Sequence, residues 1–268
     1  MKPSGIITLT SDFGLSDPYV AMMKGVILSI NPSAVLVDIS HHIGAGSISQ
    51  AARLVHESFG FFPAGTVHLS VVDPGVGSAR RLIAVKGGGH FFVGPDNGIF
   101  WPILQSHAGA MIVHLQDRRF FLPSLSQTFH GREVFAPVSA HISLGVPLDR
   151  MGPSIEDPVE LLLPLPYERE GALFGEIARV DNFGNLITNI SSKDLSRFLG
   201  SGRPRFEIGK LLIPKLSRIY AEVEEGTPVA LINSSNMLEI AVNLGRASEY
   251  VGLRDEDMIS AMVRVTKA

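Results

Sequence analysis

The sequence contains no cysteine, which excludes disulfides, thiolate nucleophiles and cysteine-ligated zinc or iron–sulfur sites. Charged residues are also scarce, at 18% of 268 residues, against roughly 25% in typical soluble domains. Apolar residues reach 45%, which excludes an intrinsically disordered chain. With a net charge of −3, nothing in the electrostatics points to nucleic acid or an acidic membrane surface.

Long apolar runs are missing as well. The best candidate for a membrane span, residues 19–30, is interrupted by Lys24 and is too short to cross a bilayer. The first residues lead directly into a strand-like segment and show no signal-peptide pattern. We therefore expect a soluble cytoplasmic protein.

Histidine is absent from the last 127 of the 268 residues. All nine histidines lie between His41 and His141, so any histidine chemistry is expected in the first half.

The first half alternates strand-like and helix-like segments, which predicts a mostly parallel, Rossmann-like sheet with helices on both faces. The expected strands are 6–10, 35–39, 66–72, 82–85, 90–93 and 111–115, and the expected helices are 18–30, 48–59, 99–105 and 133–144.

The second half follows a proline-rich stretch and contains short strands separated by turns. Strands are expected at 173–180, 205–208, 210–213, 228–232, 238–242 and 259–265, with one helix at 193–199. This spacing predicts a smaller all-β, barrel-like domain. We therefore predict an α/β domain at 1–157, a linker at 158–171 and the β domain at 172–268.

A first motif, TSDFG at residues 10–14, follows the first expected strand and supplies Asp12, with Asp17 close behind. The carboxyl end of a strand is where open α/β sheets bind ligands. Paired carboxylates suit the vicinal hydroxyls of a ribose, because ionised carboxylates only accept hydrogen bonds. Alternatively, both residues cap the following helix. No glycine-rich phosphate fingerprint is present, which argues against a dinucleotide or ATP.

A second motif, VVDPGVGSARR at residues 71–81, ends another strand in Asp73 and brings Arg80 and Arg81 within reach of it. The alternative is a turn with a surface ion pair. A third motif, TFHGREVFAP at residues 128–137, places His130 just before a helix. A lone histidine is more often a structural hydrogen-bonding group than a catalyst, and the pair His41-His42 in the loop after the second strand is the next candidate.

Two polar motifs lie in the second half: DNFGNLITN at 181–189 and NSSNMLEIA at 233–241. Asn and Ser side chains can read the edges of a base, but the same residues are common in solvated turns.

In this order, the strings TSDFG, VDPGVGxxRR, PDNG, TFHGRExFAP, DNFGN and NSSNxLEIA resemble the S-adenosyl-L-methionine hydroxide adenosyltransferase family, the SAM hydrolases related to fluorinase and chlorinase. The resemblance covers essentially the whole chain. It implies hydrolysis of S-adenosyl-L-methionine (SAM) to adenosine and methionine by attack of an activated water on the ribose C5′. It implies no metal and no cofactor, since SAM is the substrate.

The resemblance also implies a catalytic role for Asp73, Arg80 and His130. Asp73 would orient the water or accept its proton, Arg80 would keep Asp73 ionised, and His130 would complete the hydrogen bonding of the water. Whether Asp73 or His130 is the base stays open, as does Arg81 in place of Arg80.

Further residues match substrate contacts of the family. Asp12, with Asp17, matches the contact to the ribose hydroxyls, and Asp181 matches the contact to the methionine amino group. Asn185 and Tyr220 match contacts to adenine. Ser234 matches the contact to the methionine carboxylate, and Glu239 is added to this set. The halogenating relatives carry an aromatic residue at Asp73 and a serine at Gly131, which favours hydroxide over halide here.

The family assembles as homotrimers, with each active site between the α/β domain of one subunit and the β domain of its neighbour, and we expect the same here. Three rival functions remain. They are a metal-dependent hydrolase with Asp12, Asp73 and His130 as ligands, a non-catalytic adenosine- or SAM-binding protein, and a halogenase-type enzyme.

Overall fold

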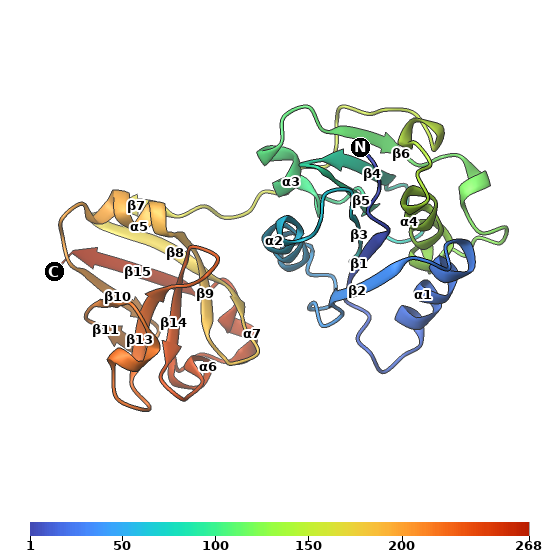
Figure 1. Ribbon diagram of the computed structural model, residues 1–268. Coiled ribbons are helices and arrows are strands. Elements are labelled where there is room, and N and C mark those ends of the chain that lie inside the picture. Colours follow the sequence, from blue (N-terminus) through green and yellow to red (C-terminus); the bar gives the residue numbers. More distant parts are fainter. Residues whose placement is uncertain (268) are drawn as a thin grey trace. The chain divides into compact units, whose positions relative to one another are not determined.

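The computed structural model describes residues 1–267, which fall into two compact units, Met1–Leu162 and a second unit from Leu163 onward (Figure 1). The strands of the first unit are β1 (Ile6–Ser11), β2 (Val35–Ser40), β3 (Val67–Val71), β4 (Leu82–Gly87), β5 (His90–Pro95) and β6 (Met111–His114). Its helices are α1 (Tyr19–Ile30), α2 (Ile48–Ser58), α3 (Trp101–Ser106) and α4 (Ala136–Ser143).

The six strands of the first unit form one sheet in the order β2-β1-β3-β5-β4-β6. Its pairs are parallel from β2 to β5, and β4 is antiparallel to both of its neighbours. This confirms the prediction of a mixed α/β fold with a mostly parallel sheet.

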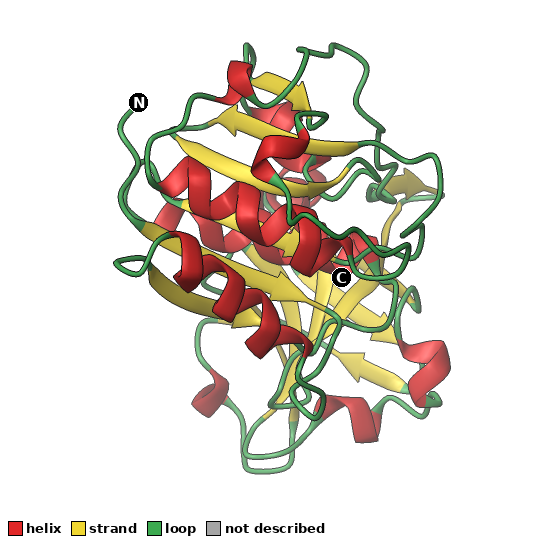
Figure 2. Cartoon of the chain, turned by 90° about the vertical axis from the view of Figure 1, so that its right-hand side faces the viewer, coloured by secondary structure: helices red, strands yellow, loops and turns green. Residues whose placement is uncertain are grey.

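Helices cover both faces of this sheet, with α1 and α4 on one side and α2 and α3 on the other (Figure 1). Figure 2, seen from the side of α1 and α4, shows the red helices lying in front of the yellow strands. Strands buried on both faces need apolar side chains in both directions, and every residue of β3 and β5 is buried.

The register between β1 and β3 determines where the first two motifs lie. Ser11 is paired with Val71 at the carboxyl ends of these parallel neighbours. The loops that carry Asp12 and Asp73 therefore leave the sheet side by side, at the edge where open α/β sheets bind ligands.

The second unit is a curled sheet with short helices. Its strands are β7 (Tyr167–Arg169), β8 (Ala172–Val180), β9 (Leu186–Ser191), β10 (Pro204–Ile208), β11 (Leu211–Ile213), β12 (Leu216–Ser217), β13 (Pro228–Ile232), β14 (Met237–Val242) and β15 (Met262–Lys267). Its helices are α5 (Ser192–Leu199), α6 (Ala247–Tyr250) and α7 (Asp255–Met258). The path β11-β10-β15-β8-β9-β14-β13-β12 curls into a nearly closed, barrel-like sheet around an apolar core.

Three local predictions differ from the structure. The end of the expected linker forms β7, which pairs with β8. The motif at 181–189 runs into a strand that was not expected, because residues 186–191 form β9 with Thr188 and Asn189 buried and hydrogen-bonded. The helix expected at 133–144 is preceded by a π-helical turn, Gly131–Phe135, before α4 begins.

Gly94 in β5 offers a test of the packing of the first unit. A Cβ added there would lie 2.4 Å from the Ser70 carbonyl oxygen and 3.0 Å from the Phe100 ring. We expect Gly94→Ala to lower the free energy of unfolding by about 1–3 kcal/mol, because the strands cannot move apart without breaking other contacts. The measurement is urea unfolding followed by the fluorescence of Trp101, the only tryptophan.

Gly25→Ala is the matched control, because an added Cβ at this exposed position of α1 meets nothing within 4 Å. It should leave stability unchanged or raise it by up to about 1 kcal/mol through helix propensity. Equal unfolding midpoints for the two variants would show that Gly94 is not packed as described.

Candidate active site

Asp12 is held in place by the loop that follows β2. Its Oδ2 accepts a hydrogen bond from the Gly46 N–H at 2.8 Å, and the Gly14 N–H donates to the His41 carbonyl at 2.8 Å. Gly46 has a φ of 69°, a left-handed conformation in which glycine is favoured. The helix-capping alternative for Asp12 and Asp17 is not met, since α1 starts after Pro18 without a side-chain cap.

The imidazole of His41 also helps to hold the loop that contains Asp12 in place. Nδ1 lies 2.7 Å from Oγ of Ser11, and Nε2 lies 3.1 Å from Oδ1 of Asp38. Lys24 in turn donates to Asp38 at 2.6 Å. Because His41 is only 3% exposed, its role in this structure is to fix the residue that precedes Asp12.

Asp73, Arg80 and His130 form one hydrogen-bonded group. Nε of Arg80 donates to Oδ1 of Asp73 at 2.8 Å, and Nη2 donates to Oδ2 of the same carboxylate. This bidentate geometry is the strong form of the Arg–carboxylate pair. The side chains of Asp73 and Arg80 are 5% and 10% exposed, so the pair is largely removed from water. Arg81 contacts Asp96 and Asp157 instead.

The second partner of Arg80 defines the protonation of His130. Nη2 of Arg80 lies 2.9 Å from Nδ1 of His130. A guanidinium only donates, so Nδ1 accepts and the neutral ring carries its proton on Nε2. Burial, followed by the positive charge of Arg80, lowers the pKa of His130, although Asp73 and Glu133 act in the opposite direction. The imidazole is therefore neutral at pH 7.

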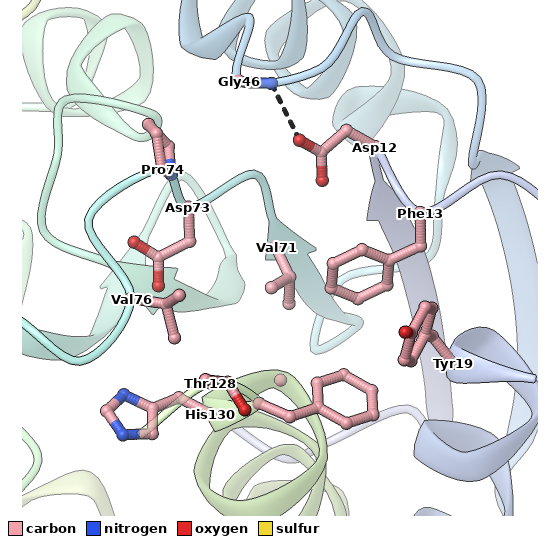
Figure 3. A pocket seen from close by; sticks show the side chains of 12 residues that line it. Asp12, Phe13, Tyr19, Gly46, Val71, Asp73, Pro74, Val76, Thr128 and His130 are labelled. Carbon is pink, nitrogen blue, oxygen red and sulfur yellow. Dashed lines mark hydrogen bonds between the residues drawn. The ribbon is translucent and has the colours of Figure 1, made fainter. Parts of the chain in front are cut away.

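Asp12, Asp73 and His130 border a cavity of about 370 Å³ in the first unit (Figure 3). Asp12 and Asp73 reach it from the ends of β1 and β3, and His130 reaches it from the turn before α4. Apolar and aromatic side chains complete the lining: Phe13, Tyr19, Val71, Pro74, Val76 and Phe129. Asp17 is exposed and is not part of this lining.

Gly131 lines this cavity and is part of the π-helical turn. A Cβ added to it would lie 3.0 Å from Sδ of Met23 and 3.2 Å from the ring of Phe129. A glycine is therefore the residue that lets this turn pack against α1 and against the cavity wall. Such π-helical turns are frequently found at functional sites.

The candidate residues of the second unit border a different cavity, of about 440 Å³. All five of them contribute to its lining: Asp181, Asn185, Tyr220, Ser234 and Glu239. The order in which they occur in the sequence gave no indication of this proximity, which the curled sheet creates by bringing β9, β13 and β14 together.

Two of these residues are bonded to each other. The Tyr220 hydroxyl donates to Oε1 of Glu239 at 2.7 Å, and Glu239 is only 3% exposed. Burial, together with the hydrogen bond to Glu239, raises the pKa of Tyr220 to about 12. Tyr220 thus stays protonated, and 43% of it remains exposed to present its ring.

Asp181 closes the turn before β9. Its Oδ1 accepts from the Phe183 and Asn185 N–H groups at 2.9 Å each, and its Oδ2 accepts from the Asn185 side chain at 3.0 Å. The turn predicted as an alternative is therefore present, and it directs Asp181 and Asn185 to the same cavity.

Comparisons with known proteins agree with these motifs. The family models of the SAM hydroxide adenosyltransferase N-terminal and C-terminal domains match residues 7–152 and 175–260. The chain belongs to the SAM hydroxide adenosyltransferase family. A relative from Thermus thermophilus, named (R)-S-adenosyl-L-methionine hydrolase, is 39% identical over 95% of this chain and 97% of its own.

More distant relatives share the architecture as well. A fluorinase from an Actinoplanes species is 29% identical over 98% of each chain. The crystal structure of an uncharacterized conserved protein from Thermotoga maritima matches with a TM-score of 0.89 and 33% identity, over 98% of this chain and all of that one.

Two further properties concern the residues that the structure describes. Within 1–267, no cluster of three or more His, Asp or Glu side chains has a geometry that could hold a metal ion. Over the same residues, no helix combines the length and the apolar character needed to cross a membrane.

The electrostatic effect of Arg80 on the site can be tested through the pKa of His130. We expect Arg80→Gln to raise the pKa of His130, because a positive charge beside the ring is removed while the burial remains. The measurement is an NMR titration of the imidazole signals, with a His130→Asn variant to assign the resonance.

Arg119→Gln serves as the control, since Arg119 is an exposed arginine that pairs with Asp117. It should leave the His130 titration where it is. A His130 pKa unaffected by Arg80→Gln would mean that burial alone depresses it.

Proposed function

We propose that this protein hydrolyses SAM to adenosine and L-methionine, with water attacking the ribose C5′. The observation that carries the proposal is the bonded group of Asp73, Arg80 and His130 in a cavity that Asp12 also borders. Relatives named (R)-S-adenosyl-L-methionine hydrolase, 33–39% identical over almost the whole chain, support the same activity.

The chemistry needs few groups from the protein. In the displacement, a water oxygen bonds to C5′ while the C5′–S bond breaks and its electron pair leaves with sulfur. The leaving group is the neutral thioether of methionine, so no negative charge develops on it and no Lewis acid is required to stabilise it. We therefore propose that the reaction uses neither metal nor cofactor.

Asp73 is the proposed base. Nδ1 of His130 is already engaged as an acceptor from Arg80, whereas each carboxylate oxygen of Asp73 keeps a free lone pair beside its Arg80 bond. Arg80 orients the carboxylate, and His130 fixes Arg80 from the other side. Asp12 would accept hydrogen bonds from the ribose hydroxyls, and Asp17 is retained only as a more distant companion.

The second unit is proposed to hold the remaining parts of SAM. Asn185 and the ring of Tyr220 would contact adenine, whereas Asp181 and Ser234 would contact the amino and carboxylate groups of methionine. Glu239 would act through Tyr220, whose hydroxyl it binds.

The proposed domains are 1–157, Rossmann-like and catalytic, and 172–268, joined to it by 158–171. We further propose a homotrimer whose sites combine the first domain of one subunit with the second domain of another.

Incubation of the protein with SAM in ¹⁸O-labelled water tests the reaction. We expect release of methionine and adenosine, with the label in the 5′ hydroxyl. Adenosine without label would exclude attack at C5′, and binding without products would favour a non-catalytic SAM-binding protein. Activity lost on exhaustive chelation would favour the metal-dependent alternative, and products that form only with added halide would favour a halogenase.

Replacement of Asp73 should separate catalysis from binding. We expect Asp73→Ala to lower kcat by about 10²–10⁴-fold, the usual contribution of a positioned general base, with a much smaller change in the Kd for SAM. Rapid-quench assays and calorimetry give the two quantities. Asp157→Ala, which removes an exposed carboxylate, is the control and should change neither. Equal losses of both would make Asp73 a binding residue.

Sharing of sites between subunits predicts complementation. Asp73→Ala and Tyr220→Ala each damage a different domain, so co-expressed subunits should regain activity only if one site uses both chains. If subunits of the two variants assemble at random, about a quarter of the sites would combine two undamaged domains, because the two domains of each site come from independently chosen subunits. Activity no higher than that of the two separate variants would place each site within one chain.

A further inference from the structure

Three aromatic side chains on the wall of the first cavity pack against one another. The ring centroids of Phe13 and Tyr19 lie 5.8 Å apart, those of Phe13 and Phe129 lie 5.6 Å apart, and those of Tyr19 and Phe129 lie 5.3 Å apart. The rings are tilted or perpendicular to one another, so they present both edges and faces. We refer to Phe13, Tyr19 and Phe129 as the aromatic wall.

The aromatic wall combines one exposed ring with two half-buried rings, because Phe13 and Phe129 pack against the core of the first unit. Tyr19, the first residue of α1, is 44% exposed. The wall also borders a second hollow of about 370 Å³, which shares all three rings and Thr128 with the first. Rings grouped in a cavity are the arrangement that recognises onium cations in proteins.

The position of the wall matches one part of the proposed reaction. Figure 3 shows Asp73 and His130 on one side of the cavity and the rings of Phe13 and Tyr19 on the other. In a direct displacement the nucleophile and the leaving group lie on opposite sides of the attacked carbon. Water held by Asp73 therefore leaves sulfur on the side of the aromatic wall.

The charges around the cavity also favour a cation at the wall. Asp73 is neutralised by its bidentate bond to Arg80, whereas the carboxylate of Asp12 accepts only the Gly46 N–H among the contacts described for it. Arg132 lies 5.0 Å from the Phe129 centroid, but it is paired with the buried carboxylate of Glu133. A single positive charge on the substrate thus complements this site.

We propose that Phe13, Tyr19 and Phe129 bind the sulfonium group of SAM by cation–π interaction. This inference rests on the proposed function and assigns these rings a role in substrate selection. The positive charge disappears as the C–S bond breaks, so the wall stabilises the bound substrate at least as much as the transition state. It therefore contributes to affinity, and to discrimination against the neutral thioether, more than to the rate of the chemical step.

Binding of two ligands that differ in this charge tests the proposal. SAM and S-adenosylhomocysteine share every group except the methyl that makes sulfur cationic. In an Asp73→Ala background, in which turnover is expected to be slow, we expect Tyr19→Leu to weaken SAM binding by about 5- to 30-fold and S-adenosylhomocysteine binding by less than about 3-fold. Calorimetry measures both constants.

Two further variants define the effect. Tyr19→Phe keeps the ring and should retain the preference for SAM, which excludes the hydroxyl as its source. Tyr250→Leu replaces a tyrosine of similar exposure in the second unit and should alter neither constant. With Asp73 intact, Tyr19→Leu should raise KM and change kcat by less than about 3-fold.

The outcomes separate this inference from the proposed function. Equal weakening of both ligands by Tyr19→Leu, or weakening of neither, would overturn the cation–π assignment while leaving SAM hydrolysis by the unmodified protein intact. Absence of adenosine release from SAM by the unmodified protein would overturn the proposed function, whereas the ratio of the two binding constants would still report on the aromatic wall.

Discussion

The parallel pairing of β1 with β3 is the constraint on which the candidate active site depends. It aligns Ser11 with Val71, so that Asp12 and Asp73, one and two residues beyond their strands, lie in neighbouring loops. Both strands are buried on two faces, and a slip of one residue would exchange the side chains directed to the two cores. The hydrophobic packing that selects the fold thus also fixes the separation of Asp12 from Asp73.

The order of strands and helices in the first unit could be predicted from the sequence, because continuous apolar runs alternate with segments of helical periodicity. The same reasoning placed Asp12 and Asp73 together, since parallel strands end at one edge of their sheet. In the second unit, the proximity of Asp181, Tyr220 and Glu239 follows from curling of the sheet, a property of the whole domain that no local pattern reports.

Details that depend on the direction in which a side chain points could not be predicted from the sequence. Arg80 and Arg81 are adjacent and chemically identical, yet Arg80 pairs with Asp73 and Arg81 with Asp96. The strand β9 was missing from the expected strands, since its buried Thr188 and Asn189 are polar and bonded to distant segments. The π-helical turn at Gly131 likewise depends on how α4 packs against α1.

Gly131 links the chemistry of this site to its possible evolutionary routes. Halogenating relatives are expected to carry a serine here, but any side chain would meet Met23 and Phe129 at about 3 Å. A single mutation toward serine would therefore need Sδ of Met23 and the ring of Phe129 to move by a few tenths of an ångström. The choice of residue at position 131 is thus coupled to two neighbouring side chains, one on α1 and one just before the π-helical turn.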